Sequence, residues 1–199
     1  MSTTKPPTVK AVAMTAPGEL ELRSYPYPQI DADSAILKVE MTGVCGTDKH
    51  IFKGEASEIR GKSIFPYIVG HEVIGTIVEI GENAARTMDF DHQPLEVGDR
   101  AALAVEVNCG ECWYCRHHYN NTTCENQVMA YGLHPNADTA PYLRGGFAEY
   151  MYILPGTSLF KIPENLPTDV AVFVEEFAVA YHSLARAAGP FAAVNEGFG

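Results

Sequence analysis

The sequence lacks the long apolar run that a membrane-spanning helix requires. A bilayer needs about 18–20 consecutive apolar residues, and no stretch of this 199-residue chain approaches that length. The first ten residues are polar and contain prolines, without the apolar centre of a secretory signal. We therefore expect a protein of the cytoplasm that does not associate with membranes.

Basic residues are also scarce. Lys and Arg number 14 against 25 Asp and Glu, which gives a formal net charge of −11. A nucleic acid would repel such a chain, so we expect no nucleic-acid partner. Apolar residues make up 46% and charged residues 20% of the chain, a composition that allows a globular core.

The hydrophobic pattern predicts a mainly β protein with short helices. Apolar–polar alternation on either side of an Ala-Pro-Gly turn predicts a hairpin, and further short strands follow along the chain. The expected strands are 10–14, 20–24, 35–41, 73–80, 100–107 and 147–153. Short strands with Gly and Pro between them favour an antiparallel barrel or sandwich.

Two segments depart from the strand pattern. The stretch 109–144 has no apolar periodicity and is expected to be a long loop that needs its own staple. After Pro167, helical spacing predicts one helix with Thr168 as N-cap, ending near Ala188 before Gly189 and Pro190. The apolar stripe of this helix consists of Val170, Phe173, Val174, Phe177, Ala180 and Tyr181.

Four of the five cysteines lie close together in the long loop, in the pattern C-x2-C-x2-C-x8-C. Thiolates at this spacing can converge on one tetrahedral Zn²⁺, and four sulfur ligands leave no position for a substrate. Without a secretory signal, a metal site is favoured over disulfides. Redox-active thiols and an iron–sulfur cluster are the alternatives. The predicted structural zinc ligands are Cys109, Cys112, Cys115 and Cys124.

The fifth cysteine and a histidine lie at strand ends. Cys45 follows the strand 35–41, and His71 with Glu72 precedes the strand 73–80. Loops at one end of a barrel can bring these side chains together. Taken singly, a buried cysteine is more often part of a core, and a lone histidine is more often structural than catalytic.

Taken together, these motifs resemble one enzyme family. The segments 43–48 (GVCGTD), 70–72 (GHE) and 97–100 (VGDR) occur in the same order, with the four-cysteine loop, as in the zinc-containing medium-chain alcohol and polyol dehydrogenases. The resemblance covers 9–188 and implies a GroES-like catalytic domain, a distorted antiparallel β-barrel with a zinc-stapled loop. Residues 1–8 are then a flexible leader.

The motif of a second domain of that family does not occur in the sequence. A Rossmann domain normally follows and carries a G-x-G-x-x-G turn for the nicotinamide cofactor, but no such motif occurs in this chain. We therefore expect 189–199 to be the start of a connection to an absent Rossmann domain, and we expect no cofactor-binding residues within the chain.

The resemblance also implies roles for the residues of the open site. Cys45 and His71 match ligands of a catalytic zinc, and Glu72 matches an acid that ligates in some members of the family. Glu175 aligns with the third protein ligand. Glu176 stands where the family has proline, so the two acids could exchange roles.

Three further residues match the machinery for proton transfer. Thr47 matches the hydroxyl that takes the alcohol proton, Asp48 matches the acid that orients the histidine ligand, and His50 matches the outer end of the proton relay. An unperturbed imidazole titrates near pH 6.5, so it can release a proton to water at neutral pH.

The expected function is oxidation of a small-molecule alcohol to an aldehyde or ketone, or the reverse reduction of a carbonyl substrate. The expected cofactors are one catalytic and one structural zinc, with NAD or NADP in the complete protein, which the resemblance implies is a homo-oligomer. The fragment alone is expected to be inactive. The alternative is a zinc-stabilised binding or scaffold module without chemistry, which would leave Cys45, His71 and Glu175 unexplained.

Overall fold

Antiparallel pairing dominates the structure, a computed structural model that describes residues 5–55, 58–59, 62–117, 123–133 and 137–188. Its strands are β1 (Thr8–Ala16), β2 (Glu19–Pro26), β3 (Ala35–Thr42), β4 (Glu58–Ile59), β5 (Lys62–Ser63), β6 (Tyr67–Ile68), β7 (Val73–Ile80), β8 (Arg100–Leu103), β9 (Glu106–Val107), β10 (Met129–Ala130), β11 (Tyr150–Ile153) and β12 (Leu159–Lys161). Its helices are α1 (Gly46–Phe52), α2 (Ala84–Thr87), α3 (Trp113–His117), α4 (Thr168–Ala171) and α5 (Val174–Ala188). The mainly β fold class is confirmed.

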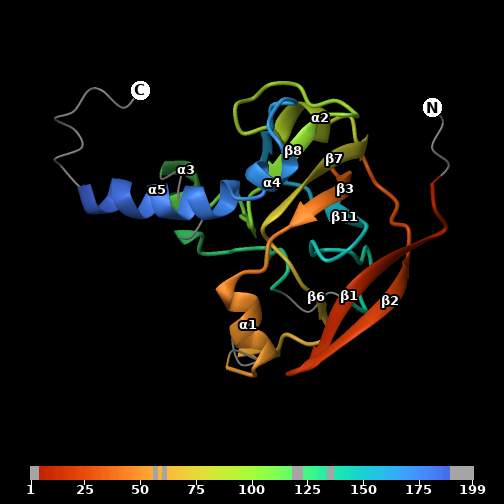
Figure 1. Ribbon diagram of the computed structural model, residues 1–199. Coiled ribbons are helices and arrows are strands. Elements are labelled where there is room, and N and C mark those ends of the chain that lie inside the picture. Colours follow the sequence, from red (N-terminus) through yellow and green to blue (C-terminus); the bar gives the residue numbers. More distant parts are fainter. Residues whose placement is uncertain (1–4, 56–57, 60–61, 118–122, 134–136, 189–199) are drawn as a thin grey trace.

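Two sheets form the body of the molecule (Figure 1). One has the strand order β11-β3-β7-β8-β12, and the other has the order β2-β1-β6. The segment just before β11 joins them, because Phe147 O accepts from Val12 N at 2.8 Å and Glu149 O accepts from Val39 N at 3.1 Å. The strands therefore wrap into a distorted antiparallel barrel, as the sequence predicts.

The main core lies against the five-stranded sheet. Alternating side chains of β3, β7, β8 and β11 turn inward, where burial of apolar surface stabilises the fold by about 25 cal/mol per Å². This core consists of Ala35, Leu37, Val73, Ile77, Ala84, Met88, Leu95, Ala101, Leu103, Val107, Met129, Tyr131, Met151, Ile153 and Leu159. A smaller cluster packs around β1 and β6, including Val9, Ala11 and Ile68.

The predicted hairpin and most predicted strands are present. β1 and β2 pair antiparallel from Thr8 opposite Pro26 to Ala16 opposite Glu19, and β3 and β7 match their predicted segments closely. The predicted strand 100–107 is instead two strands, because the chain changes partners. β8 pairs with β7 and β12, whereas β9 pairs with β10.

The predicted single helix is wrong in two respects. It is divided into α4 and α5, and Pro167 occupies the N-cap position of α4. The Thr168 hydroxyl does not cap the helix, because it donates to the Glu40 carboxylate at 3.2 Å and accepts from Arg100 at the same distance.

The apolar stripe of α5 faces outward in this chain. Phe177 and Tyr181 are each 67% exposed, and Leu184 is 70% exposed. In Figure 1, α5 extends away from the sheets, with only its first turns close to the barrel. Within the part of the chain that the structure describes, no helix is long and apolar enough to cross a membrane.

The ends of the chain bear on the predicted boundaries. β1 begins at Thr8, and the Lys5 ammonium lies 2.6 Å from the Glu79 carboxylate, so part of the predicted leader contacts the barrel. The predicted connection 189–199 lies outside the described residues.

Candidate metal centre and catalytic cavity

The four cysteines of the long loop converge on one point, as their spacing predicts. The sulfur of Cys115 lies 3.4 Å from that of Cys112 and 3.9 Å from that of Cys109, and Cys124 lies 3.6 Å from Cys109. Four thiolates bound to Zn²⁺ at about 2.3 Å lie about 3.8 Å apart in a tetrahedron. The cluster therefore fits one zinc ion after shifts of a few tenths of an ångström.

Backbone N–H donors favour the thiolate form of two of these cysteines, the form that binds a cation. The backbone N–H groups of Glu111 and Cys112 lower the pKa of the Cys109 thiol, and those of Cys115 and Glu125 lower the pKa of Cys112 to about 6. Burial and the neighbouring sulfurs raise the pKa of Cys115 to about 12. Four packed sulfurs cannot all ionise together without a cation between them, and a bound metal removes that conflict.

Cys45 is held by the start of α1. It is the N-cap residue, and its sulfur accepts from the backbone N–H of Thr47 at 3.5 Å. The Asp48 carboxylate accepts from the Cys45 backbone N–H at 2.9 Å, which completes a capping box. The short helix therefore fixes the direction of the sulfur, although the strand-based sequence analysis did not predict α1.

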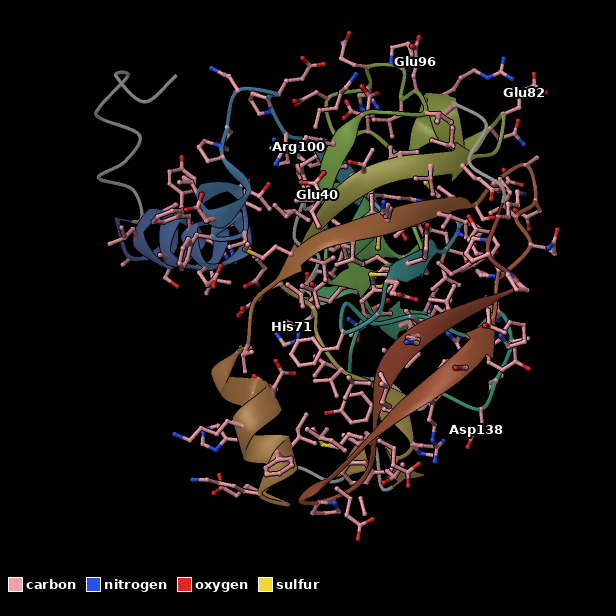
Figure 2. All side chains as sticks on the ribbon, turned by 45° about the vertical axis from the view of Figure 1, so that its right-hand side comes forward. Glu40, His71, Glu82, Glu96, Arg100 and Asp138 are labelled. Atoms are coloured by element: carbon pink, nitrogen blue, oxygen red, sulfur yellow. The ribbon has the colours of Figure 1, made fainter. Side chains whose placement is uncertain are left out.

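The backbone just before His71 packs closely against the ring of Phe147. Gly70, just before it, has a φ of +96°, and a Cβ there would lie 2.6 Å from the ring of Phe147. His71 is 6% exposed, and its Nδ1 lies 3.8 Å from the Asp48 carboxylate. Figure 2 shows His71 between α1 and the sheets. The 3.8 Å distance is too long for a hydrogen bond, but it places the Asp48 carboxylate on the Nδ1 side of the ring.

Glu72 completes this group. Ligand atoms of Cys45, His71 and Glu72 all lie within 4.8 Å of one another. Donors of a tetrahedral zinc site lie about 3.3–3.8 Å apart. Side-chain rotations that draw the three atoms together would therefore let them share one ion. A Cβ on Gly43 would lie 2.0 Å from Glu72 Oε2, so only glycine allows the backbone so close to this carboxylate.

Two acids of α5 approach the same place from the other side. Carboxylate oxygens of Glu72, Glu175 and Glu176 also lie within 4.8 Å of one another. The structure thus brings Glu72 to the Cys45–His71 pair and groups Glu175 with Glu72 and Glu176. Burial, followed by the charge of Glu176, raises the pKa of Glu72, and burial is also the main cause of the raised pKa of Glu175.

Arg100 anchors the chain that leads to these acids. Its guanidinium donates to the Leu166 carbonyl at 2.8 Å, to the Pro163 carbonyl at 3.2 Å and to the Thr168 hydroxyl at 3.2 Å. It also lies 3.1 Å from the Glu40 carboxylate of β3 (Figure 2). The arginine of the VGDR motif therefore ties the start of α4 to the sheet.

A cavity of about 470 Å³ opens onto the ligand group. Its lining includes Cys45, His71 and Glu72, together with Glu175 and Glu176 of α5. Thr47 also lines it, whereas His50 lies on the exposed side of α1, where its Nδ1 contacts the Glu55 carboxylate. The structure thus brings Thr47 and Asp48 to the ligand group and leaves His50 at the outer surface.

Glu106 was missed by sequence reasoning. It lies at the start of β9, is partly buried and lines the same cavity. Its position just before the cysteine loop was the available signal, but a single acid in an expected strand does not stand out without the fold.

These features agree with comparisons to known proteins. Residues 31–164 match the family described as the alcohol dehydrogenase GroES-like domain. The chain belongs to this family. It is 36% identical over 169 residues to L-threonine 3-dehydrogenase of Coxiella burnetii, a match that covers 84% of this chain and 43% of that protein. It is 35% identical over 181 residues to D-arabinitol dehydrogenase 1 of Uromyces fabae, a match that covers 91% of this chain and 45% of that protein.

Solved structures of the family share the fold. An alcohol dehydrogenase of Thermotoga maritima superimposes with a TM-score of 0.77 at 27% identity, covering 89% of this chain and 47% of that one. A short chain alcohol dehydrogenase of Escherichia coli in complex with the cofactor NADH gives a TM-score of 0.70 at 28% identity. The superposition covers 88% of this chain and 44% of that one. The chain spans less than half the length of these family members.

Proposed function

We propose that this chain is the catalytic part of a zinc-dependent alcohol or polyol dehydrogenase. The reaction would oxidise an alcohol to an aldehyde or ketone, with NAD or NADP accepting the hydride. The observation that carries the proposal is the convergence of Cys45, His71 and Glu72 at a cavity, beside a separate four-sulfur cluster. The threonine and arabinitol dehydrogenases named above support alcohols and polyols as the substrate class.

The two groups fit zinc in different ways. Cys109, Cys112, Cys115 and Cys124 would close a structural site. Cys45, His71 and Glu72 offer three ligands, the number that leaves one position open in a catalytic site. We propose Glu72 as the third ligand, with Glu175 and Glu176 as the acids that can replace it. Zinc bound there would supply Lewis acidity that lowers the pKa of the substrate hydroxyl.

The residues around the ligands have distinct tasks. Asp48, 4% exposed, would hold the His71 ring in place. Thr47, at the cavity wall, would accept the proton of the alcohol through its hydroxyl. His50, 62% exposed at its side chain and in contact with Glu55, would release that proton to water. His71 and Glu72 are 6% and 4% exposed, so the protein would shield the reacting end from bulk water on this side.

The nicotinamide cofactor and the oligomer belong to the same proposal. The relatives are about twice as long as the matched region, so we propose that NAD or NADP binds outside this chain. A homo-oligomer is proposed for the complete protein. A cytoplasmic location is also proposed, supported by five cysteines that form no disulfide.

Rejoining the two halves tests this function. Fused to the cofactor half of the arabinitol dehydrogenase, the chain should reduce NAD or NADP in the presence of polyols, measured by absorbance. The Cys45→Ala variant of the fusion should lose this activity while keeping its structural zinc. A fusion that folds and binds cofactor but oxidises no alcohol would contradict the proposal.

A further inference from the structure

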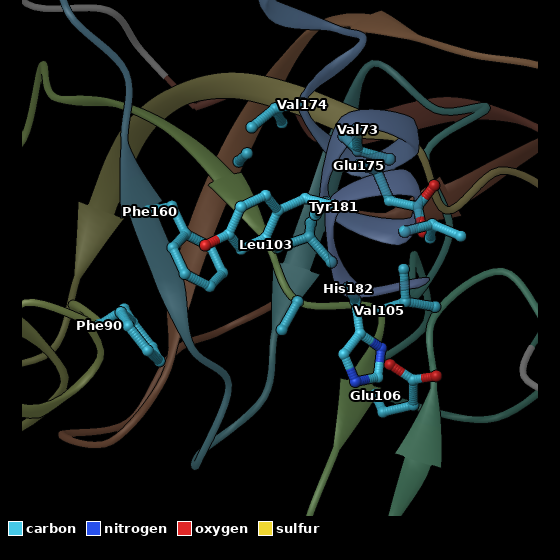
Figure 3. Close-up of a pocket in the computed structure, with 14 residues that line it drawn as sticks. Val73, Phe90, Leu103, Val105, Glu106, Phe160, Val174, Glu175, Tyr181 and His182 are labelled. Carbon is cyan, nitrogen blue, oxygen red and sulfur yellow. The ribbon is translucent and has the colours of Figure 1, made fainter. Parts of the chain in front are cut away.

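Glu106 lies where two cavities meet. The cavity at Cys45 and His71 adjoins a second cavity of about 460 Å³ between α5 and the sheet, drawn in Figure 3. Both are lined by Val105, Glu106, Glu175 and Val179. A ligand bound in either cavity can therefore lie against Glu106.

The backbone of Glu106 is fixed. Residue 106 is paired with Ala130 in the two-stranded sheet of β9 and β10. Val107, next to it, is fully buried in the main core, and Tyr131 N donates to Val105 O at 2.9 Å. The carboxylate thus extends from a rigid support, as a residue that selects a ligand by geometry must.

The surroundings of Glu106 are acidic. Figure 3 shows the Glu106 carboxylate facing the ring of His182. His182 lies on α5, the helix that also carries Glu175. The negative charge of Glu106 contributes to the raised pKa of Glu175, after burial and the charges of Glu72 and Glu176. Among the described residues that line either cavity, none is Lys or Arg.

A second observation concerns the metal end of this cavity, where buried polar atoms lack hydrogen-bond partners among the described residues. His71 is only 6% exposed. Neither its Nδ1 nor Asp48 Oδ1 has a hydrogen-bond partner among the described residues. Buried polar atoms are rarely left unpaired. Binding of a metal or substrate at this end would therefore favour a shorter distance between His71 Nδ1 and Asp48 Oδ1. The acids therefore adjoin a defined polar site and are not an isolated surface cluster.

We propose that Glu106 is a specificity-determining residue, which accepts a hydrogen bond from a second donor on the substrate. The inference rests on the proposed function. The preferred substrates are alcohols that carry a further hydroxyl or an ammonium group, and alcohols that carry a carboxylate or phosphate are disfavoured. A partly buried carboxylate attracts a cation and repels an anion more strongly than it would in water. A site that hydrogen-bonds a donor also discriminates against the analogue that lacks it.

Four matched ligands test this inference on the chain itself. Butan-2-ol, butane-1,3-diol, 4-aminobutan-2-ol and 3-hydroxybutyrate share a secondary alcohol and differ in the second group. Cobalt replaces zinc, and its absorption bands report ligands at the open site. The spectrum of Cys45→Ser, which retains the four-sulfur site, is subtracted.

The expected order of affinity follows from the charge of the second group. The diol and the amine should perturb the bands at concentrations at least about tenfold lower than butan-2-ol. In Glu106→Gln the advantage of the amine should fall by about tenfold or more, and 3-hydroxybutyrate should bind more tightly. Butan-2-ol should be unchanged. Glu164→Gln, at an exposed position, serves as the matched control and should behave as the unaltered chain.

Two different failures can be told apart. A Cys45-dependent cobalt band with the same ligand preferences in Glu106→Gln overturns the inference about Glu106 alone. Identical spectra for the unaltered chain and Cys45→Ser overturn the proposed function, and the inference with it.

Discussion

The two candidate metal sites differ in how the chain builds them. The four-sulfur site comes from one loop, with all ligands between Cys109 and Cys124, and its sulfurs already have tetrahedral spacing. The open site joins the N-cap of α1 to the segment before β7, and α5 supplies the acids beside it. A local site with four ligands can hold a polar loop in place. A non-local site with three ligands depends on the barrel around it and retains room for a substrate.

The largest effect is expected at the local site. Cys112→Ser removes one of four ligands, and structural zinc contributes on the order of 10–16 kcal/mol to folding in isolated zinc-finger peptides. We expect a loss of about 3–5 kcal/mol here, because the barrel core remains, and therefore a fall in Tm of about 6–20 °C. Thermal unfolding measures it. An unchanged Tm with two zinc ions still bound would contradict the structural role.

A smaller effect is expected from the backbone that holds His71. Gly70→Ala combines a positive φ with a contact of 2.6 Å to the Phe147 ring, and should cost about 2–3 kcal/mol in urea unfolding. It should also weaken metal binding at the open site. Gly18→Ala is the matched control, since its φ is +79° but nothing lies within 4 Å of its Cβ. If both variants lose equal stability, the close packing at Gly70 has no effect of its own.

Ligand removal at the open site should affect metal content more than stability. Cys45→Ala or His71→Ala should each lose one zinc per chain and change the free energy of unfolding by about 1 kcal/mol, within the usual range for single substitutions. Zinc analysis and urea unfolding of the same samples measure both. Global unfolding of either variant would show that the two sites are not independent.

The smallest effect is a pH dependence. Burial raises the pKa of Asp48 and of Glu72, so the folded chain without metal at the open site keeps protons that the unfolded chain releases above about pH 4. Their contribution to stability is therefore present at low pH and is lost as pH rises through the folded pKa values.

A pair of variants isolates this pH dependence. Cys45→Ser keeps the four-sulfur site and empties the open one, so a second change at Glu72 can be compared with it over about pH 4 to 7 on an equal background. Adding Glu72→Gln should make the decline with rising pH shallower. Equal slopes in the two variants would show that Glu72 does not carry the effect.

The spacing of residues predicted the local features, whereas the non-local ones were predicted from strand ends and from the family resemblance. The four cysteines are close in sequence, so their spacing alone predicted a cluster. That Cys45 and His71 lie close together could be predicted only from how the ends of the strands meet in a barrel. Glu106 was missed because its partners come from β10 and α5. The break between α4 and α5 was missed because Thr168 bonds to Glu40 and Arg100, contacts that helical spacing does not encode.

The zinc content of freshly purified, unchelated protein tests the central claim most directly. The account predicts two zinc ions per chain, with one lost in Cys45→Ala and the other weakened in Cys112→Ser. One zinc in the unaltered chain, retained in Cys45→Ala, would contradict the open site. A folded protein without zinc would contradict the whole account.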